Sequence, residues 1–88
     1  MAKAVVDPEE LRRFAQDLKR FNTELKNQMT ILNGRFIGLG QTWRDQEQRK
    51  FAMEFDQTLK TLNRFMESAD EQIPFLLRKA EKIEEYLG

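Results

Sequence analysis

The stretch that decides the fold is Gly38-Leu39-Gly40-Gln41-Thr42-Trp43-Arg44-Asp45, near the middle of an 88-residue chain. On both sides of it, apolar residues recur every three or four positions, which is the spacing of helices and not of strands. The stretch itself contains two glycines and the only tryptophan of the chain. Turns usually favour small and polar residues, so a tryptophan in this place is unusual. The pattern predicts an all-α antiparallel two-helix hairpin that occupies residues 1–88 as a single domain.

The first helix is predicted over about residues 7–38. Asp7 is a good N-cap, and Pro8 suits the first helical position. Asn33-Gly34 has the composition of a turn, but the apolar pattern stays in phase beyond it, so the helix is expected to pass through Gly34. A glycine inside a helix costs only about 1 kcal/mol. The apolar positions of this segment are Leu11, Phe14, Leu18, Phe21, Leu25, Met29, Leu32, Phe36 and Leu39.

The second helix is predicted over about residues 45–86, after a turn at about 39–44. Thr42 with Asp45, or Asp45 with Gln48, would cap its N-terminus. Pro74 lies inside the segment, where it removes one backbone donor and clashes with the preceding turn, so a kink is expected near it. The apolar positions are Phe51, Phe55, Leu59, Leu62, Met66, Ala69, Ile73, Leu76, Ala80, Ile83 and Leu87.

A hairpin of this length buries little core by itself, and small domains often need oligomerisation to be stable. Further apolar residues lie off the two main seams, and one neighbouring helix would not cover them; they are Ile31, Ile37, Phe65, Phe75 and Leu77. A second hairpin would cover them, which predicts a four-helix bundle formed with a second copy or with a related hairpin protein. The alternative is that these residues are isolated and exposed, which is normal on protein surfaces. The predicted hairpin or dimer seam consists of Leu18, Phe21, Leu25, Met29, Leu32, Phe51, Phe55, Leu59, Leu62 and Met66.

The composition argues against an enzyme. The chain has no cysteine and no histidine, so thiolate metal sites and the commonest general base are both missing. No catalytic, cofactor-binding or metal-binding constellation is predicted. The 15 basic residues balance the 15 acidic ones. Basic residues repeat along the first helix, but acidic residues interleave with them, which argues against binding to nucleic acid.

The apolar runs are too short for a membrane protein or a cleaved signal. No stretch approaches the roughly 20 apolar residues that span a bilayer, so no stable membrane insertion is expected. Amphipathic helices alone would also suit a membrane-active protein, but the balanced charge argues against that class. The N-terminal apolar run is too short for a secretory signal. The expected location is the cytoplasm, or outside the cell by a route that reads no cleaved signal peptide.

These features together resemble the WxG family, the early-secretory-antigen-like substrates of type VII secretion systems. The resemblance covers essentially the whole chain. It rests on the tryptophan in the mid-chain turn, the Asp7-Pro8-Glu9 helix start, and an aromatic residue, Phe51, eight positions after the tryptophan. Two features depart from the family pattern. Asp45 stands where the motif has glycine, and Tyr86 is followed only by Leu87-Gly88 instead of completing a Tyr-x-x-x-Asp/Glu signal.

The resemblance implies a small non-enzymatic protein that is exported as a folded dimer or that escorts a larger effector. It also implies a recognition role for the turn residues Trp43, Arg44 and Asp45, which would form a composite surface for a secretion ATPase together with the C-terminal end of a partner's helix. Two alternatives remain open at this point. Trp43 could simply seal the end of the hairpin against Leu39 and Phe36, and the protein could be an intracellular coiled-coil adaptor with no link to export.

Overall fold

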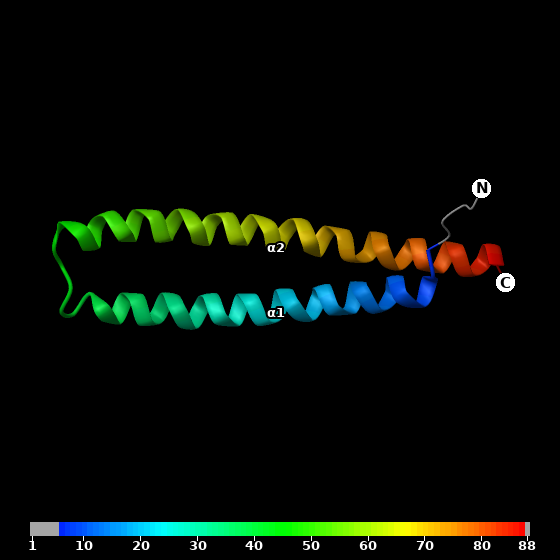
Figure 1. The fold of residues 1–88 in the computed structure, drawn as a ribbon, viewed down its shortest axis with the longest axis horizontal. Coiled ribbons are helices and arrows are strands. Elements are labelled where there is room, and N and C mark those ends of the chain that lie inside the picture. The colour runs from blue at the N-terminus through cyan, green and yellow to red at the C-terminus, as the bar shows by residue number, and fades with distance from the viewer. Residues whose placement is uncertain (1–5, 88) are drawn as a thin grey trace.

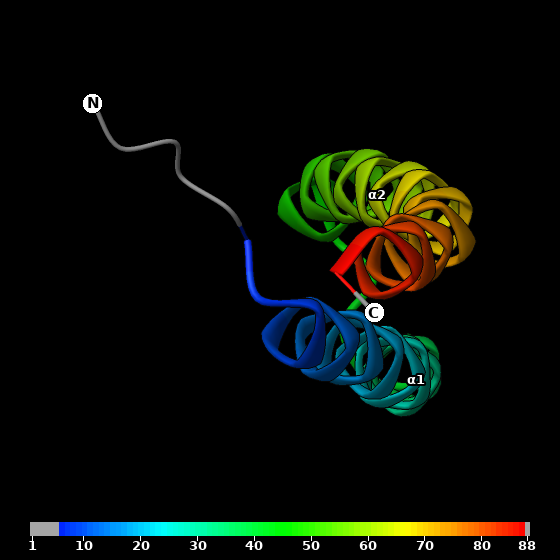
Figure 2. The ribbon, with the colours of Figure 1, turned by 90° about the vertical axis from the view of Figure 1, so that its right-hand side faces the viewer.

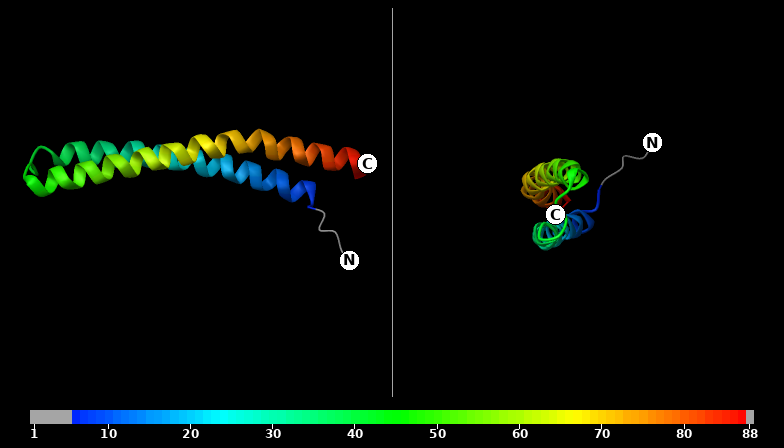
Figure 3. Two further views of the ribbon diagram at one scale, coloured as in Figure 1. Left: turned by 90° about the horizontal axis from the view of Figure 1, so that it is seen from above. Right: turned by 90° about the vertical axis from the view of Figure 1, so that its left-hand side faces the viewer.

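Two long helices side by side make up the computed structural model, which describes residues 6–87. Helix α1 (Pro8–Leu39) and helix α2 (Gln46–Leu87) run in opposite directions and are joined by residues 40–45 (Figure 1). The molecule measures 63 × 24 × 17 Å, and an end-on view shows α1 and α2 lying against one another (Figure 2). Seen from above, the two helices cross at a shallow angle (Figure 3). The predicted all-α hairpin of two long helices is confirmed.

The helix ends follow from local chemistry. The backbone N–H of Glu9 donates to the Asp7 carboxylate at 2.9 Å, so Asp7 caps α1 and Pro8 occupies its first turn. Helix α1 continues through Gly34 without interruption, and α2 continues through Pro74. Part of the proline cost is offset by the seam residues on both sides of it, which keep their contacts with α1 only if the helix continues. A kink at Pro74 stays a prediction.

The contact between the helices is thin. The least exposed positions of α2 are separated by alternating steps of three and four residues, as in a coiled coil; they are Ala52, Phe55, Leu59, Leu62, Met66, Ala69, Ile73, Leu76, Ala80 and Ile83. On α1 they are Leu11, Ala15, Leu18, Asn22, Leu25, Met29, Asn33 and Phe36. Among the described residues, the only buried apolar ones are Ala15, Met66, Ala69 and Ala80. Three of these four are alanines, so the buried core contains little apolar volume.

The predicted seam divides into two groups. Leu18, Leu25, Met29, Phe55, Leu59 and Leu62 are partly buried between the helices, and Met66 is buried. Phe21, Leu32 and Phe51 are instead about half-exposed along one edge of the contact. Ala15, Asn22 and Asn33 take the inward positions of α1 in place of Phe14, Phe21 and Leu32. Helix α1 is therefore rotated about its axis relative to the seam predicted from the apolar pattern.

An ion pair joins the two helices at the open end of the hairpin. The Arg12 guanidinium donates to Glu84 Oε2 at 2.9 Å and also contacts Glu84 Oε1. These hydrogen bonds lower the pKa of Glu84 below its ordinary value of 4.5 and raise the pKa of Arg12. Because both side chains remain partly exposed, solvent and salt screen the attraction.

The pair predicts a pH-dependent stability. A carboxylate whose pKa is lower in the folded state stabilises the fold above its unfolded pKa, and the contribution is lost as pH falls through the folded value. The melting temperature of Glu84→Gln is therefore expected to lie below that of the wild type at pH 7 and to converge with it as the pH falls below the lowered pKa of Glu84. Thermal melts from pH 7 to pH 3 measure this, with the neighbouring Glu85→Gln as the control. A Glu84→Gln deficit that persists unchanged at pH 3 would contradict it.

Candidate functional site: the turn and an apolar face

Four aromatic rings cluster at the closed end of the hairpin. Phe36 of α1 lies 5.5 Å from Phe51 and 5.1 Å from Phe55 of α2, measured between ring centroids. Phe51 and Phe55 stack on one another at 5.7 Å. The Trp43 ring lies 6.1 Å from Phe51 and is partly buried. Separations of this size favour aromatic pairs, so the rings tie the two helices together next to the turn.

Trp43 extends this cluster from the turn. Its backbone N–H donates to the Leu39 carbonyl at 2.8 Å, which places the residue directly after the last turn of α1. Its ring packs on Phe51, the residue eight positions later, and Phe51 in turn contacts Phe36. The side chain thus covers the end of the cluster while keeping part of its surface in solvent, where a partner can reach it.

Arg44 and Asp45 each complete a helix end. The Arg44 guanidinium donates to the Gly40 carbonyl at 2.9 Å and to the Gln41 carbonyl at 3.1 Å, so a cation satisfies acceptors just beyond the C-terminus of α1. Asp45 accepts the backbone N–H of Gln48 at 2.9 Å and caps α2. Of the two capping arrangements expected from the sequence, Asp45 with Gln48 is the one that forms. The role of Arg44 has no local signature in the sequence, because it depends on how the turn folds back.

The departure from the family motif at Asp45 has a structural reason. None of the residues from 6 to 87 has a positive φ, so this turn does not need the conformational freedom that glycine provides. A capping carboxylate at this position satisfies an N–H group of α2 that a glycine side chain could not.

Restoring the motif glycine is therefore expected to bring no gain in stability. Asp45→Ala should cost about 0.5–2 kcal/mol and Asp45→Gly a few tenths of a kcal/mol or more, because each removes the cap of α2. Urea unfolding followed by circular dichroism measures both losses, and Asp45→Asn, which keeps the capping oxygen, is the control. A rise in stability for Asp45→Gly would contradict this account of the turn.

One side of the hairpin carries a row of half-exposed apolar side chains from both helices. On α1, Phe14, Phe21, Leu32 and Leu39 are spaced by seven or eleven residues, which places them on one edge of that helix. The rings of Phe21 and Phe65 meet at 6.2 Å in a T-shaped contact, so the edge of α2 that carries Phe65 lies beside it. We use the name apolar face for Phe14, Phe21, Leu32, Leu39, Phe51 and Phe65. These side chains are between 44% and 56% exposed. Next to the turn, the face deepens into a groove of about 410 Å³ between the helices, lined by Leu32, Arg35, Phe36, Leu39, Phe51 and Phe55.

The opposite side of the hairpin is polar. Two adjoining hollows between the helices share Lys26 and Asn63. The larger, of about 420 Å³, is lined by Lys19, Asn22, Thr23, Lys26, Asn63, Met66, Glu67 and Asp70. The smaller, of about 250 Å³, is lined by Lys26, Met29, Thr30, Asn33, Leu59 and Asn63. The two sides of the helix contact thus differ in chemistry, and only one of them has the composition of a protein interface core.

Sequence reasoning missed this difference between the sides. The signal that could have revealed it is the pair Phe21-Asn22, where an aromatic and a polar residue both fall near the seam. Of the extra apolar residues noted in the sequence, Phe65 belongs to the apolar face. The other four are also exposed but are not part of the apolar face; they are Ile31, Ile37, Phe75 and Leu77.

The described residues offer neither a metal site nor a membrane span. Residues 6–87 contain no group of three or more acidic, histidine or cysteine side chains that could hold a metal ion. In that part of the chain, neither helix combines the length and the apolar character needed to cross a membrane.

The comparisons with known proteins point to one family. A sequence profile described as proteins of 100 residues with WXG matches residues 4–86. A selenomethionine structure of EsxB, a secreted protein from Bacillus anthracis strain Sterne, is 28% identical and superposes with a TM-score of 0.78 over 100% of both chains. A wild-type structure of EsxB is 30% identical with a TM-score of 0.77, over 96% of this chain and 97% of the other. No curated protein sequence matches.

The profile match and the EsxB match extend over almost the whole chain, and the turn that carries Trp43 lies inside both. Proteins of this family are non-enzymatic secreted substrates that typically form dimers, so the prediction that the chain is not an enzyme is confirmed. The chain belongs to the WXG100 family and is similar throughout its length to secreted EsxB.

Proposed function

We propose that this protein is a type VII secretion substrate that pairs with a second copy through the apolar face and is exported as a folded four-helix bundle. The observation that carries the proposal is the apolar face itself. It runs along a hairpin whose buried apolar core, within residues 6–87, consists of four small or flexible side chains. A soluble monomer rarely leaves a row of apolar side chains of this length uncovered.

The size of the exposed surface supports pairing. The whole 88-residue chain exposes 7419 Å², whereas a compact monomer of 10.5 kDa would expose about 5,400 Å². Its radius of gyration is 19.7 Å, against about 12 Å for a compact domain of this length. A stable interface buries about 800 Å² on each partner. The apolar face spans residues 14–39 of α1, so an interface of that size would also include the polar residues that flank the face.

The turn would serve as the recognition element of the exported dimer. Trp43 keeps part of its ring in solvent, and Arg44 and Asp45 stabilise the turn around it. Within one hairpin, the turn and the C-terminal end of α2 lie at opposite ends (Figure 1). A second copy that runs in the opposite direction would bring its C-terminal end beside the Trp43 turn. This arrangement would form the composite surface that a secretion ATPase reads.

The test is export in the native host with and without the secretion ATPase. The tagged protein is expected in the culture medium only when the ATPase is present, while a protein exported through a cleaved signal peptide is unaffected. Trp43→Ala should reduce the extracellular level while the protein stays folded inside the cell, and the exposed Met53→Ala should not. Unchanged extracellular protein without the ATPase would overturn the proposal. If the hairpin instead escorts a larger effector, its deletion would remove another protein from the medium.

A further inference from the structure

Hydrophobicity alone would bury Phe21 of α1 and expose its neighbour Asn22, but the structure shows the reverse. Asn22 is 5% exposed and faces α2, while Phe21 is 51% exposed on the apolar face. A buried amide is costly unless it is hydrogen-bonded, and an aromatic ring gains more from burial than an amide does. In an isolated hairpin, rotating α1 so that Phe21 turns inward and Asn22 turns outward would be the more favourable arrangement on these grounds.

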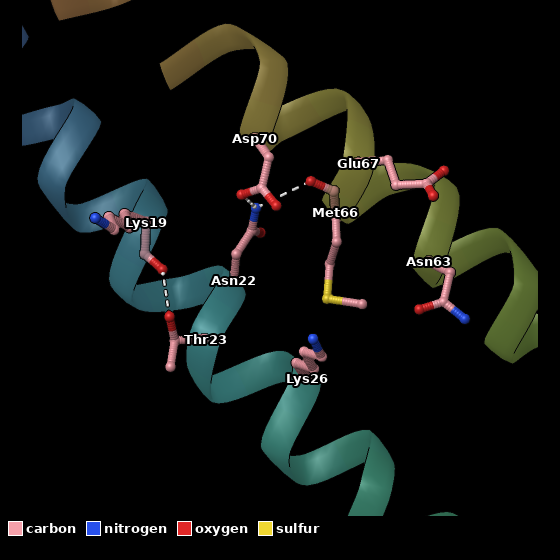
Figure 4. Close-up of a pocket in the computed structure, with 8 residues that line it drawn as sticks. All are labelled: Lys19, Asn22, Thr23, Lys26, Asn63, Met66, Glu67 and Asp70. Atoms are coloured by element: carbon pink, nitrogen blue, oxygen red, sulfur yellow. Dashed lines mark hydrogen bonds between the residues drawn. The ribbon is translucent and has the colours of Figure 1, made fainter. Parts of the chain in front are cut away.

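Hydrogen bonds to α2 hold Asn22 in the inward position. Its Nδ2 donates to Asp70 Oδ1 at 3.0 Å and to the Met66 carbonyl at 3.2 Å (Figure 4). Its Oδ1 is buried and has no hydrogen-bond partner among the described residues. An unsatisfied buried acceptor destabilises a fold. The unsatisfied acceptor offsets part of what the two hydrogen bonds contribute, and the bonds also fix which face of α1 points at α2.

The arrangement is specific in both rotation and register. The Asp70 carboxylate is within reach of Asn22 only while that face of α1 points at α2. A slip of one heptad along α2 would place Asn63 or Leu77 where Asp70 lies, and neither offers a carboxylate. Single buried polar residues set register in this way in coiled coils. The same rotation keeps Phe14 and Phe21 on the outer edge, where Phe21 meets Phe65.

We propose that the pair Asn22 and Asp70 are positioning residues that hold α1 in the rotation that presents the apolar face to a second copy of this chain. The inference rests on the proposed dimer. Within the hairpin, Phe21 is buried only in part, by its contact with Phe65, and the dimer would cover the rest of the ring. Asp70 itself is exposed on the polar side of the hairpin, so it acts on the face only through Asn22.

A double-mutant cycle on the full chain tests this mechanism. In the wild-type background, Asp70→Ala leaves Asn22 without its side-chain acceptor. Helix α1 is expected to turn Asn22 outward, so the nuclear Overhauser contacts between Phe21 and Phe65 weaken and the dimer dissociation constant rises about tenfold or more. Asn22→Leu removes the buried amide, keeps an apolar residue inside, and is expected to raise the melting temperature by about 5 °C. In the Asn22→Leu background, Asp70→Ala should change dimer affinity by less than about twofold.

Asp56→Ala is the matched control, because Asp56 is an exposed carboxylate of α2 whose ion pair is with Lys60 of the same helix. Asn33→Leu is a second control. Asn33 also faces α2 but makes no side-chain hydrogen bond in the described structure, so its replacement should leave the effect of Asp70→Ala intact. If Asp70→Ala weakens the dimer equally in the wild type and in Asn22→Leu, Asp70 contacts the partner directly and the inference is overturned. So would no weakening in either background.

The two proposals fail in different ways. If the wild type is monomeric at all concentrations, the proposed dimer is wrong, and the Phe21 to Phe65 contacts still report whether Asp70 sets the rotation of α1. If the wild type is a dimer and Asp70→Ala leaves both the ring contacts and the affinity unchanged, the positioning role is wrong and the dimer stands.

Discussion

Phe21→Glu combined with Phe65→Glu is expected to convert the dimer into a monomer of 10.5 kDa. The two rings meet at 6.2 Å within the apolar face, one from each helix. Two glutamates there would place like charges together and bury them against a second copy, a cost of about 3 kcal/mol or more. This corresponds to a dissociation constant at least about a hundredfold higher. Sedimentation equilibrium across a concentration series measures the shift.

The matched control places the same charges on the other side of the hairpin. Thr23→Glu with Asn63→Glu adds two carboxylates on the same two helices, among residues that line the polar hollow. This variant should remain dimeric. Dissociation of the control and persistence of the Phe21/Phe65 variant as a dimer would locate the interface on the polar side and contradict the proposed function. Circular dichroism checks that both variants keep their helices.

Phe36→Ala is expected to be the most destabilising single truncation at the closed end. Phe36 is the only α1 ring that contacts both Phe51 and Phe55 among the described residues, and it is partly buried. Truncating a fully buried phenylalanine costs about 3–5 kcal/mol, so a partly buried one should cost about 2–4 kcal/mol. For a domain of this size, that lowers the melting temperature by roughly 10–25 °C. Thermal denaturation at one fixed protein concentration measures it, because pairing couples stability to concentration.

Two comparisons make the Phe36 result interpretable. Ile37→Ala, at the adjacent position where the side chain is 66% exposed, should change stability by less than about 0.5 kcal/mol. Trp43→Ala should fall between the two, at about 1–2 kcal/mol, because its ring is partly buried and contacts one aromatic partner. A loss for Trp43→Ala as large as that for Phe36→Ala would assign the tryptophan mainly to packing and weaken its recognition role.

The presence of the two helices and their antiparallel direction could be predicted from the sequence, because both follow from local features. Asp7 and Asp45 cap the helices through residues two or three positions away. The apolar repeat continues for several turns on both sides of Gly34 and of Pro74, and neither residue ends its helix. Two helices of this length joined by a six-residue connection have only one way to pack together, which is antiparallel. The family resemblance likewise depends on a short local motif and on chain length.

The angular setting of α1 could not be predicted in this way. A repeat of three and four residues shows that a helix has an apolar stripe. The stripe of α1 is wide, and either of its two edges could face α2. Hydrophobicity favours the edge with Phe14 and Phe21, and the tertiary structure uses the edge with Ala15 and Asn22. Small side chains allow the helices to approach closely there, and Asp70, 48 residues away in sequence, satisfies the amide.

The sequence by itself therefore determined the two helices, their caps, the turn between them and the family. Only the tertiary structure decided which edge of α1 faces α2, and with it the division into an apolar face and a polar side. The physical reason is that caps and periodicity depend on neighbours within a few residues. Rotation and register depend instead on contacts such as Asn22 with Asp70 and Phe21 with Phe65, which exist only once the helices are packed.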